Sequence, residues 1–211
     1  MENNLHIQQL VKRYSQLAEL KNEIERAGKA IIDSYENGGK VLVCGNGGSA
    51  SDSDHIVGEL MKSFEVKRPV NQILKTNLKN VASDRGWYLS EKLQQGLPAI
   101  SLTAHSALIS AVANDIDGDL VFAQQVTGYG NKGDILIGMS TSGNSQNVID
   151  ALIVAKAKNL VTIGFTGKTG GKMKEFCDIL INVPESRTAF VQELHLPIYH
   201  ILCLEVENHF F

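Results

Sequence analysis

This 211-residue sequence has few cysteines, no long apolar run and no large excess of either charge. No apolar run reaches the roughly 18 residues that a membrane helix needs. The three cysteines, Cys44, Cys177 and Cys203, lack the spacing of a metal or redox site. This sparse set of thiols, with a polar N-terminus that resembles neither a signal nor a transit peptide, predicts a cytoplasmic protein.

The charge balance argues against polyanionic partners. The formal net charge is -3, so the chain lacks the basic surface that nucleic acids or anionic membranes attract. We therefore expect neither nucleic acid nor a membrane as a partner. The length fits one domain over residues 1–211 better than two.

Five short and almost continuously apolar segments are distributed along the chain, at residues 40–44, 99–103, 135–139, 161–165 and 179–183. Such segments are typical of parallel strands that are buried on both faces. Helical or loop sequence separates them. This alternation predicts an α/β fold, a three-layer αβα sandwich around a five-stranded parallel sheet of the flavodoxin-like or Rossmann-like kind.

Three other segments complete the expected architecture. Apolar residues spaced three and four apart predict one helix over residues 5–36, within an N-terminal helical segment over 1–36. Its apolar residues occupy more than one side, which indicates a partner interface. Residues 189–210 form the expected closing helix, with a kink at Pro197. Residues 70–97 form an insertion that has helical character only in patches.

A glycine loop, CGNGGSA at residues 44–50, follows the first expected strand. Its glycines let the backbone approach a ligand, and the next helix offers free N–H groups to an anion. The spacing also approximates the dinucleotide fingerprint G-x-G-x-x-A, which requires an acidic residue after the next strand. That strand ends in Ala104 and His105 instead. A purely structural turn is the other alternative.

A serine loop, STSGNS at residues 140–145, follows the strand at 135–139 and opens a helix. A phosphate monoester at a helix N-terminus gains hydroxyl donors, backbone donors and the positive end of the helix dipole. Capping a helix requires only one serine or threonine. Four hydroxyls in six residues therefore favour a phosphate site.

Acid–base candidates lie on two expected helices. His55 and Glu59 are four residues apart and share a helix face, and Gln192 and His200 are two helical turns apart. Two nitrogens, a carboxylate and an amide oxygen suit a divalent metal such as zinc. A surface pair and a core histidine explain the same residues without a metal. The spacing does not distinguish His195 from His200.

At these residues the sequence resembles the phosphoheptose isomerase family, which carries a sugar isomerase (SIS) domain. The matching stretches run in family order over nearly the whole chain: CGNGGS at 44–49, HxxxEL at 55–60, KRP at 67–69, ND at 114–115, GDILIGMSTSGNS at 133–145, TGK at 166–168, GGKM at 170–173, and QELH at 192–195 followed by His200. The long serine-loop match is the most specific of them.

The resemblance implies the activity and the role of each residue. Members interconvert sedoheptulose 7-phosphate and a heptose 7-phosphate through an enediol, with Glu59 and His200 as the implied acid–base pair. The implied zinc site, one per subunit, consists of His55, Glu59, Gln192 and His200. The implied substrate contacts are Asn46, Gly47, Gly48, Ser49, Asn114, Asp115, Ser140, Thr141, Ser142, Ser145 and Gln192. The family is usually homotetrameric, with sites built where subunits meet.

The sequence also departs from the family pattern. Ser63 replaces an arginine of close relatives, and Ala189-Phe190 replaces a polar residue followed by arginine. The insertion has no counterpart in short members. We expect it to fold partly as helix over the site mouth and to supply cations there, with an oligomer contact as the alternative. Other functions left open are a non-catalytic SIS protein that associates with the initiator DnaA, and a phosphosugar sensor.

Overall fold

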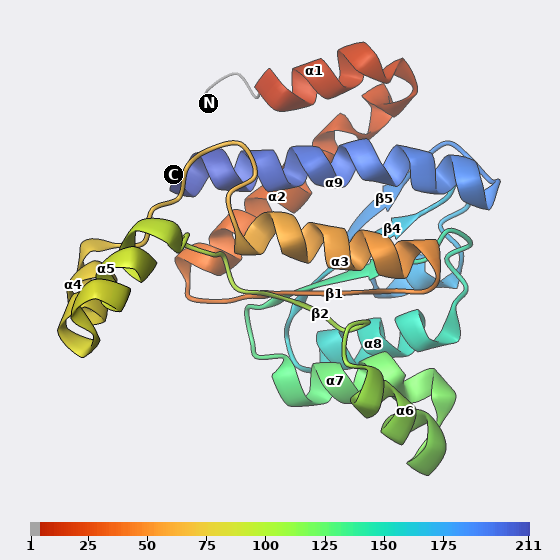
Figure 1. Cartoon of the computed structure of the whole chain (residues 1–211). Helices are drawn as coiled ribbons and strands as arrows, with labels where there is room; N and C mark the ends of the chain where they lie inside the picture. The colour runs from red at the N-terminus through yellow and green to blue at the C-terminus, as the bar shows by residue number, and fades with distance from the viewer. Residues whose placement is uncertain (1–4) are drawn as a thin grey trace.

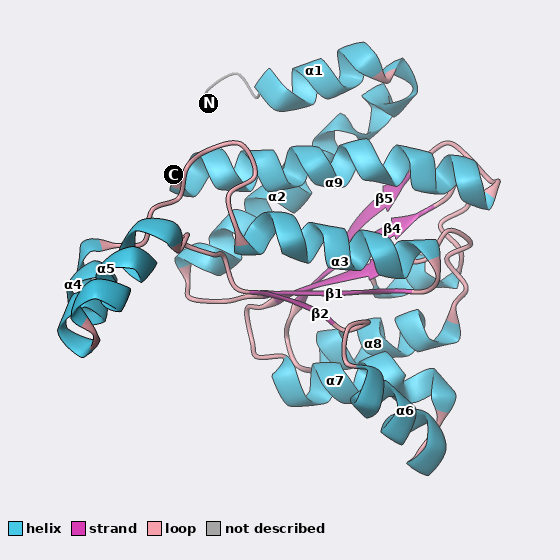
Figure 2. Cartoon of the chain, in the orientation of Figure 1, coloured by secondary structure: helices cyan, strands magenta, loops and turns pink. Residues whose placement is uncertain are grey.

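The computed structural model describes residues 5–211, so residues 1–4 of the expected N-terminal segment lie outside the described residues. A five-stranded parallel sheet with strand order β2-β1-β3-β4-β5 runs through the centre of the chain (Figures 1 and 2). The strands are β1 (Val41–Gly45), β2 (Ala99–Ser101), β3 (Ile135–Met139), β4 (Val161–Thr166) and β5 (Ile179–Asn182). The predicted sheet is therefore confirmed.

Helices cover both faces of the sheet. One face carries α2 (Lys21–Glu36), α3 (Gly48–Met61) and α9 (Thr188–Phe210), and the other carries α6 (Ser106–Asp115), α7 (Val121–Tyr129) and α8 (Gln146–Ala157) (Figure 1). Successive strand residues point to opposite faces. Val41 and Val43 accordingly pack into the core beneath α2, α3 and α9, whereas Leu42 and Cys44 pack into the core on the other side. The three-layer sandwich is confirmed.

The N-terminal segment is not the single helix that the sequence predicts. It divides into α1 (Leu5–Arg13), a 3₁₀ helix at Ser15–Leu20, and α2. The break lies at Tyr14, whose φ of -129° and ψ of 73° are not helical. The turn lets α1 lie across the outer side of α9 while α2 packs between α9 and the sheet (Figure 1). The apolar side chains Leu10, Leu17 and Ile24, one on each of the three parts, are buried, and this burial stabilises the bent arrangement.

The expected insertion folds as a helical hairpin of α4 (Gln72–Val81) and α5 (Ser83–Lys92). The two helix backbones approach closely at Gly86, which has no side chain; a Cβ there would collide with the carbonyl of Leu78. The hairpin projects from the end of the sheet opposite to the glycine and serine loops (Figure 1). The expectation of helix is thus right, but within one chain the hairpin does not cover those loops. Its Lys75 faces Glu91 and its Arg85 stacks on Tyr88, so these cations stay within the hairpin.

The helices α3 and α9 lie side by side and run in the same direction (Figure 2). α9 continues through Pro197 to Phe210, as the sequence predicts. The loop after α3 is joined to α9 by a buried ion pair, in which Arg68 Nε donates to Glu207 Oε1 at 2.7 Å. Two short 3₁₀ helices, Gly118–Leu120 and Lys172–Phe176, complete the described elements.

The three cysteines are free thiols. Burial raises the pKa of Cys44 and of Cys203 to about 12, so both behave as inert core residues. Within residues 5–211, no helix has the length and apolar character required to cross a membrane.

Candidate active site

The glycine loop connects the carboxyl end of β1 to the first turn of α3. Gly47 has φ +57°, a conformation that glycine adopts without strain. The side-chain amides of Asn46 and Asn147 exchange two hydrogen bonds, at 2.8 and 3.0 Å. This amide pair joins the glycine loop to α8, the helix that follows the serine loop. Asn147 was not selected from the sequence, since nothing local distinguishes it.

The serine loop connects β3 to α8 and turns at Gly143, where φ is +69°. A Cβ at Gly143 would collide with the backbone of Gly170, so the loop packs directly on the segment after β4. The hydroxyls of Ser140 and Ser145 lie 2.9 Å apart. Because β1 and β3 are neighbouring parallel strands, their two loops meet at one edge of the sheet.

The two loops enclose a cavity of about 280 Å³. Its lining residues are Asn46, Gly47, Gly48, Ser49, Met139, Ser140, Thr141, Ser145, Thr188 and Gln192. All of them are uncharged. An anion here would be held by hydroxyls, backbone N–H groups and the positive ends of α3 and α8. We call this the anion cavity.

Two groups of sequence-predicted residues lie outside the anion cavity. Ser142 is exposed, and its Oγ accepts a hydrogen bond from the Asn144 backbone N–H at 3.2 Å. Asn114 and Asp115 end α6, where Asn114 Nδ2 donates to Asp115 Oδ1 at 2.7 Å. The structure does not bring these three side chains to the cavity. In contrast, Thr188 lines the cavity and was not selected from the sequence.

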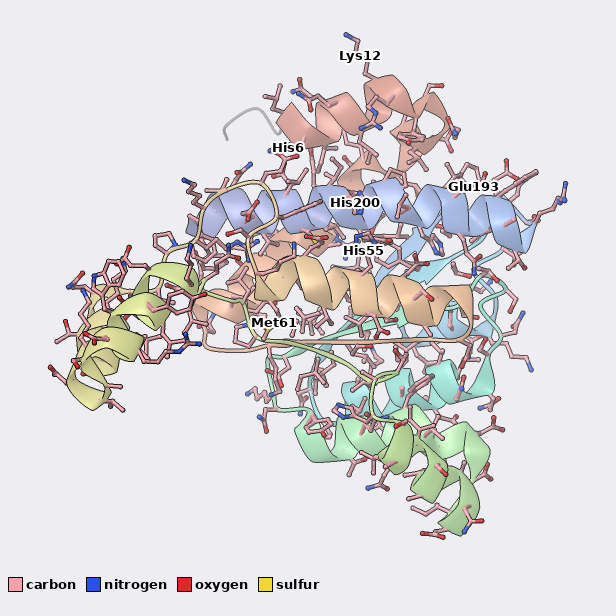
Figure 3. All side chains as sticks on the ribbon, in the orientation of Figure 1. His6, Lys12, His55, Met61, Glu193 and His200 are labelled. Atoms are coloured by element: carbon pink, nitrogen blue, oxygen red, sulfur yellow. The ribbon has the colours of Figure 1, made fainter. Side chains whose placement is uncertain are left out.

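A second group of polar residues lies further along α3 and α9. His55 Nε2 is 3.3 Å from Glu59 Oε1, and Lys62 Nζ is 2.9 Å from Glu59 Oε2. The His200 ring meets the His55 ring edge to face, with centroids 5.0 Å apart. The labelled His55 and His200 come from α3 and α9 respectively (Figure 3). The predicted His55, Glu59 and His200 are therefore brought together.

The structure distinguishes the two histidines of α9. His195 is fully buried, and its Nε2 is 3.2 Å from the carbonyl oxygen of Thr166. Burial lowers the pKa of His195 to about 4, so this ring is a neutral core group near pH 7. Burial, followed by the neighbouring His55, also lowers the pKa of His200, whereas Glu59 raises it. Only His200 faces the other acid–base candidates.

Gln192 lines the anion cavity. A Cβ at Gly48 would lie 2.5 Å from Gln192 Nε2, so the amide packs directly on the glycine loop. His200 follows two turns later, about 12 Å along the helix. Across residues 5–211 no three His, Cys, Asp or Glu side chains form a ready-made metal cluster. Two donors stand adjacent, His55 Nε2 and Glu59 Oε1, and the buried His200 Nε2 has no hydrogen-bond partner in the described part of the chain.

Two more residues of this group were missed. Tyr199 OH lies 3.0 Å from His55 Nδ1 and donates to Asp52 Oδ1 at 3.1 Å. The spacing of Asp52 and His55 on α3 could have suggested a shared face. The partner from α9 could not be deduced, because a tyrosine beside a histidine in an apolar helix is ordinary core composition.

Comparison with known proteins identifies the family of the chain. Residues 6–85 and 84–167 match the SIS domain family. The chain is 41% identical to the phosphoheptose isomerase of Burkholderia pseudomallei over 188 residues, which cover 89% of this chain and 82% of the relative. It is 39% identical to the phosphoheptose isomerase of Aliarcobacter butzleri, with 90% and 86% covered.

Solved structures show the same relationship. The phosphoheptose isomerase of Francisella tularensis superposes with a TM-score of 0.77 at 32% identity, and that of Neisseria gonorrhoeae with 0.75 at 31%. Each comparison covers 97% of this chain and 96% of the solved chain. The sheet order, the two loops and the matched sequence lead to one conclusion: the chain belongs to the phosphoheptose isomerase family of SIS-domain proteins.

Proposed function

We propose that this protein is a cytoplasmic phosphosugar isomerase that interconverts sedoheptulose 7-phosphate and a heptose 7-phosphate. The observation that carries the proposal is the anion cavity, in which uncharged hydroxyl and amide donors from two loops converge at the N-termini of α3 and α8. Such a cavity suits a phosphate monoester. The acid–base group lies further along α3 and on α9, the helix that also contributes Gln192 to the cavity. The three free thiols suit a reducing compartment.

Isomerisation between an aldose and a ketose moves a proton between neighbouring carbons. In our proposal the Glu59 carboxylate removes the proton from the carbon beside the carbonyl, and the bond electrons form the enediol double bond. His200 gives a proton to the carbonyl oxygen. The reverse transfers complete the reaction at the other carbon.

A resident divalent ion is also proposed, held by His55, Glu59 and His200. The support is chemical. His55 Nε2 and Glu59 Oε1 face each other at 3.3 Å, and the buried His200 Nε2 lacks a partner among residues 5–211. Gln192, the fourth residue implied by the family, lies in the anion cavity. A bound zinc ion would polarise the substrate carbonyl.

Replacing Glu59 tests the proposed base. Glu59→Gln should lower the turnover of sedoheptulose 7-phosphate by roughly two powers of ten or more, the usual contribution of a general base. The measurement is product analysis after incubation with the sugar phosphate. Glu36→Gln, on the surface of α2 beside His209, is the matched control and should be unaffected. Wild-type turnover in Glu59→Gln would remove Glu59 from the mechanism, and an inactive wild type would favour a sensor or initiator-associating protein.

The anion cavity can be tested by comparing two serines of one loop. Ser145→Ala should weaken binding of the sugar phosphate by about 1 kcal/mol or more, the cost of one lost hydrogen bond. Ser142→Ala should weaken it less, because Ser142 does not line the cavity. Titration calorimetry with the phosphorylated and unphosphorylated sugars measures both changes. An equal loss for the two sugars would show that the loop does not bind phosphate.

Elemental analysis tests the proposed ion. The purified protein should carry about one divalent ion per chain, because three protein ligands with a fourth position left to water or substrate suit a catalytic zinc site. His55→Ala should lose the ion, whereas His209→Ala, at the far end of α9, should keep it. A fully active wild type that contains no metal would exclude this role.

We further propose a homotetramer in which the hairpin of α4 and α5 forms a subunit contact. Apolar side chains are exposed there: Ile73 is 75% exposed, Val81 86% and Trp87 59%. A clustered apolar surface of this kind marks an interaction site. Light scattering should give about four times the 23.0 kDa of one chain, and Val81→Glu with Trp87→Glu should reduce it. A monomeric wild type would contradict the proposal. A tetramer that withstands both substitutions would place the contact elsewhere.

A further inference from the structure

A line of hydrogen-bonding groups connects the proposed base to a half-buried carboxylate, that of Asp52. Glu59 Oε1 lies 3.3 Å from His55 Nε2, and His55 Nδ1 lies 3.0 Å from Tyr199 OH. Tyr199 in turn donates to Asp52 Oδ1 at 3.1 Å. Asp52, His55 and Glu59 occupy successive turns on one face of α3, the face that meets α9. The line therefore depends on the packing of the two helices.

The proton on Tyr199 decides the direction of these bonds. Tyr199 is only 1% exposed, and the pKa of a tyrosine phenol is ordinarily about 10. The phenol therefore keeps its proton near pH 7, and it has only one to donate. Since that proton goes to Asp52 Oδ1, Tyr199 can only accept from His55. The proton of a neutral His55 ring must then reside on Nδ1.

We propose that Tyr199 and Asp52 are positioning residues that hold His55 as the Nδ1–H tautomer, with the Nε2 lone pair facing Glu59. The histidine tautomer is set by the partner of the other ring nitrogen. The His200 ring, edge-on to both His55 and Tyr199 at 5.0 and 5.1 Å, restricts rotation of the imidazole. Neither Tyr199 nor Asp52 lines the anion cavity, so their effect reaches the chemistry through His55.

This orientation has a chemical consequence. With Nε2 unprotonated, a lone pair faces a carboxylate oxygen at 3.3 Å, and two electron-rich atoms at that distance repel each other. A proton or a cation between them relieves the repulsion. The orientation thus favours either a proton that Glu59 has taken from substrate or a bound ion. This consequence rests on the proposed function, whereas the tautomer itself does not.

The opposite orientation is the competing arrangement. If Asp52 were protonated and donated to the phenol oxygen, Tyr199 would donate to His55 Nδ1. The ring would then carry its proton on Nε2 and donate it to Glu59. The two arrangements predict different protonated nitrogens on one ring, which makes them separable by measurement.

The experiment is two-bond ¹H–¹⁵N NMR of the full-length protein with ¹⁵N-labelled histidine, recorded at about pH 8.5, where an ordinary histidine is neutral. Spectra are recorded before and after treatment with a chelator, so that a metal on Nε2 does not impose the tautomer. His55→Gln assigns the His55 signals. The wild type should show Nδ1 protonated and Nε2 bare. Tyr199→Phe and Asp52→Ala should each populate the Nε2–H tautomer.

Two matched variants serve as controls. Tyr35→Phe removes a buried hydroxyl from α2 that donates to the carbonyl of Pro98, and Asp54→Ala removes an α3 carboxylate that accepts from Ser101 and Thr103. Both should keep the wild-type tautomer of His55. If Tyr199→Phe does not fold, Asp52→Ala answers the same question, because it leaves the ring of Tyr199 in place.

Kinetics provide the second measurement. Tyr199→Phe should lower kcat for the sugar phosphate about tenfold with little change in KM, because phosphate contacts remain intact. A wild-type His55 protonated on Nε2 would overturn the proposal. So would a Tyr199→Phe protein whose tautomer matches that of Tyr35→Phe. If no sugar phosphate is turned over, the proposed function fails while the NMR result still decides the tautomer.

Discussion

The buried ion pair of Arg68 and Glu207 is the interaction on which the acid–base end of the molecule depends. Both side chains are fully buried. Glu207 accepts from the backbone N–H groups of Phe64, Glu65 and Val66, while Arg68 donates to the carbonyls of Glu59 and Leu60. Although burial alone would raise it, these hydrogen bonds hold the pKa of Glu207 below its ordinary value. Loss of one partner would leave an uncompensated buried charge, which costs about 3–5 kcal/mol.

The ion pair lies at one end of the pair of helices α3 and α9, and the anion cavity lies at the other end. α3 and α9 lie in parallel on one face of the sheet, so that Gln192 meets Gly48 at one end and Glu207 meets Arg68 at the other. Between these contacts lie His55, Tyr199 and His200. His55 follows Gly48 by seven residues, about 10 Å of helix. The anion cavity and the proposed acid–base residues are therefore separated along the same pair of helices, and their spacing depends on how the helices pack.

The differences from the sequence-based expectations have physical causes. Residues 5–36 carry an uninterrupted helical pattern, but the chain bends at Tyr14, and the parts on both sides of the bend bury apolar side chains in the core around α9. The insertion was expected over the site because it follows Glu59 in sequence. It projects from the end of the sheet opposite to the glycine and serine loops, because α3 carries the chain away from the carboxyl ends of the strands before the insertion begins. Ser142 was grouped with its neighbours by composition, yet the loop turn at Gly143 directs its hydroxyl to the Asn144 backbone.

The sequence by itself determined the five strands, the parallel sheet and the place of the glycine and serine loops after two of its strands, because apolar runs and glycine turns are local patterns. The two loops meet because β1 and β3 are neighbours, which only the structure shows. Residue spacing did not distinguish the two histidines of α9. The family resemblance implied His200, and the tertiary structure shows the His200 ring against His55. Only the tertiary structure decided that Tyr199 links His55 to Asp52, and that Arg68 meets Glu207. These contacts join residues more than a hundred positions apart. They depend on the rotation of α9 about its axis relative to α3, which the packing of the whole apolar core determines.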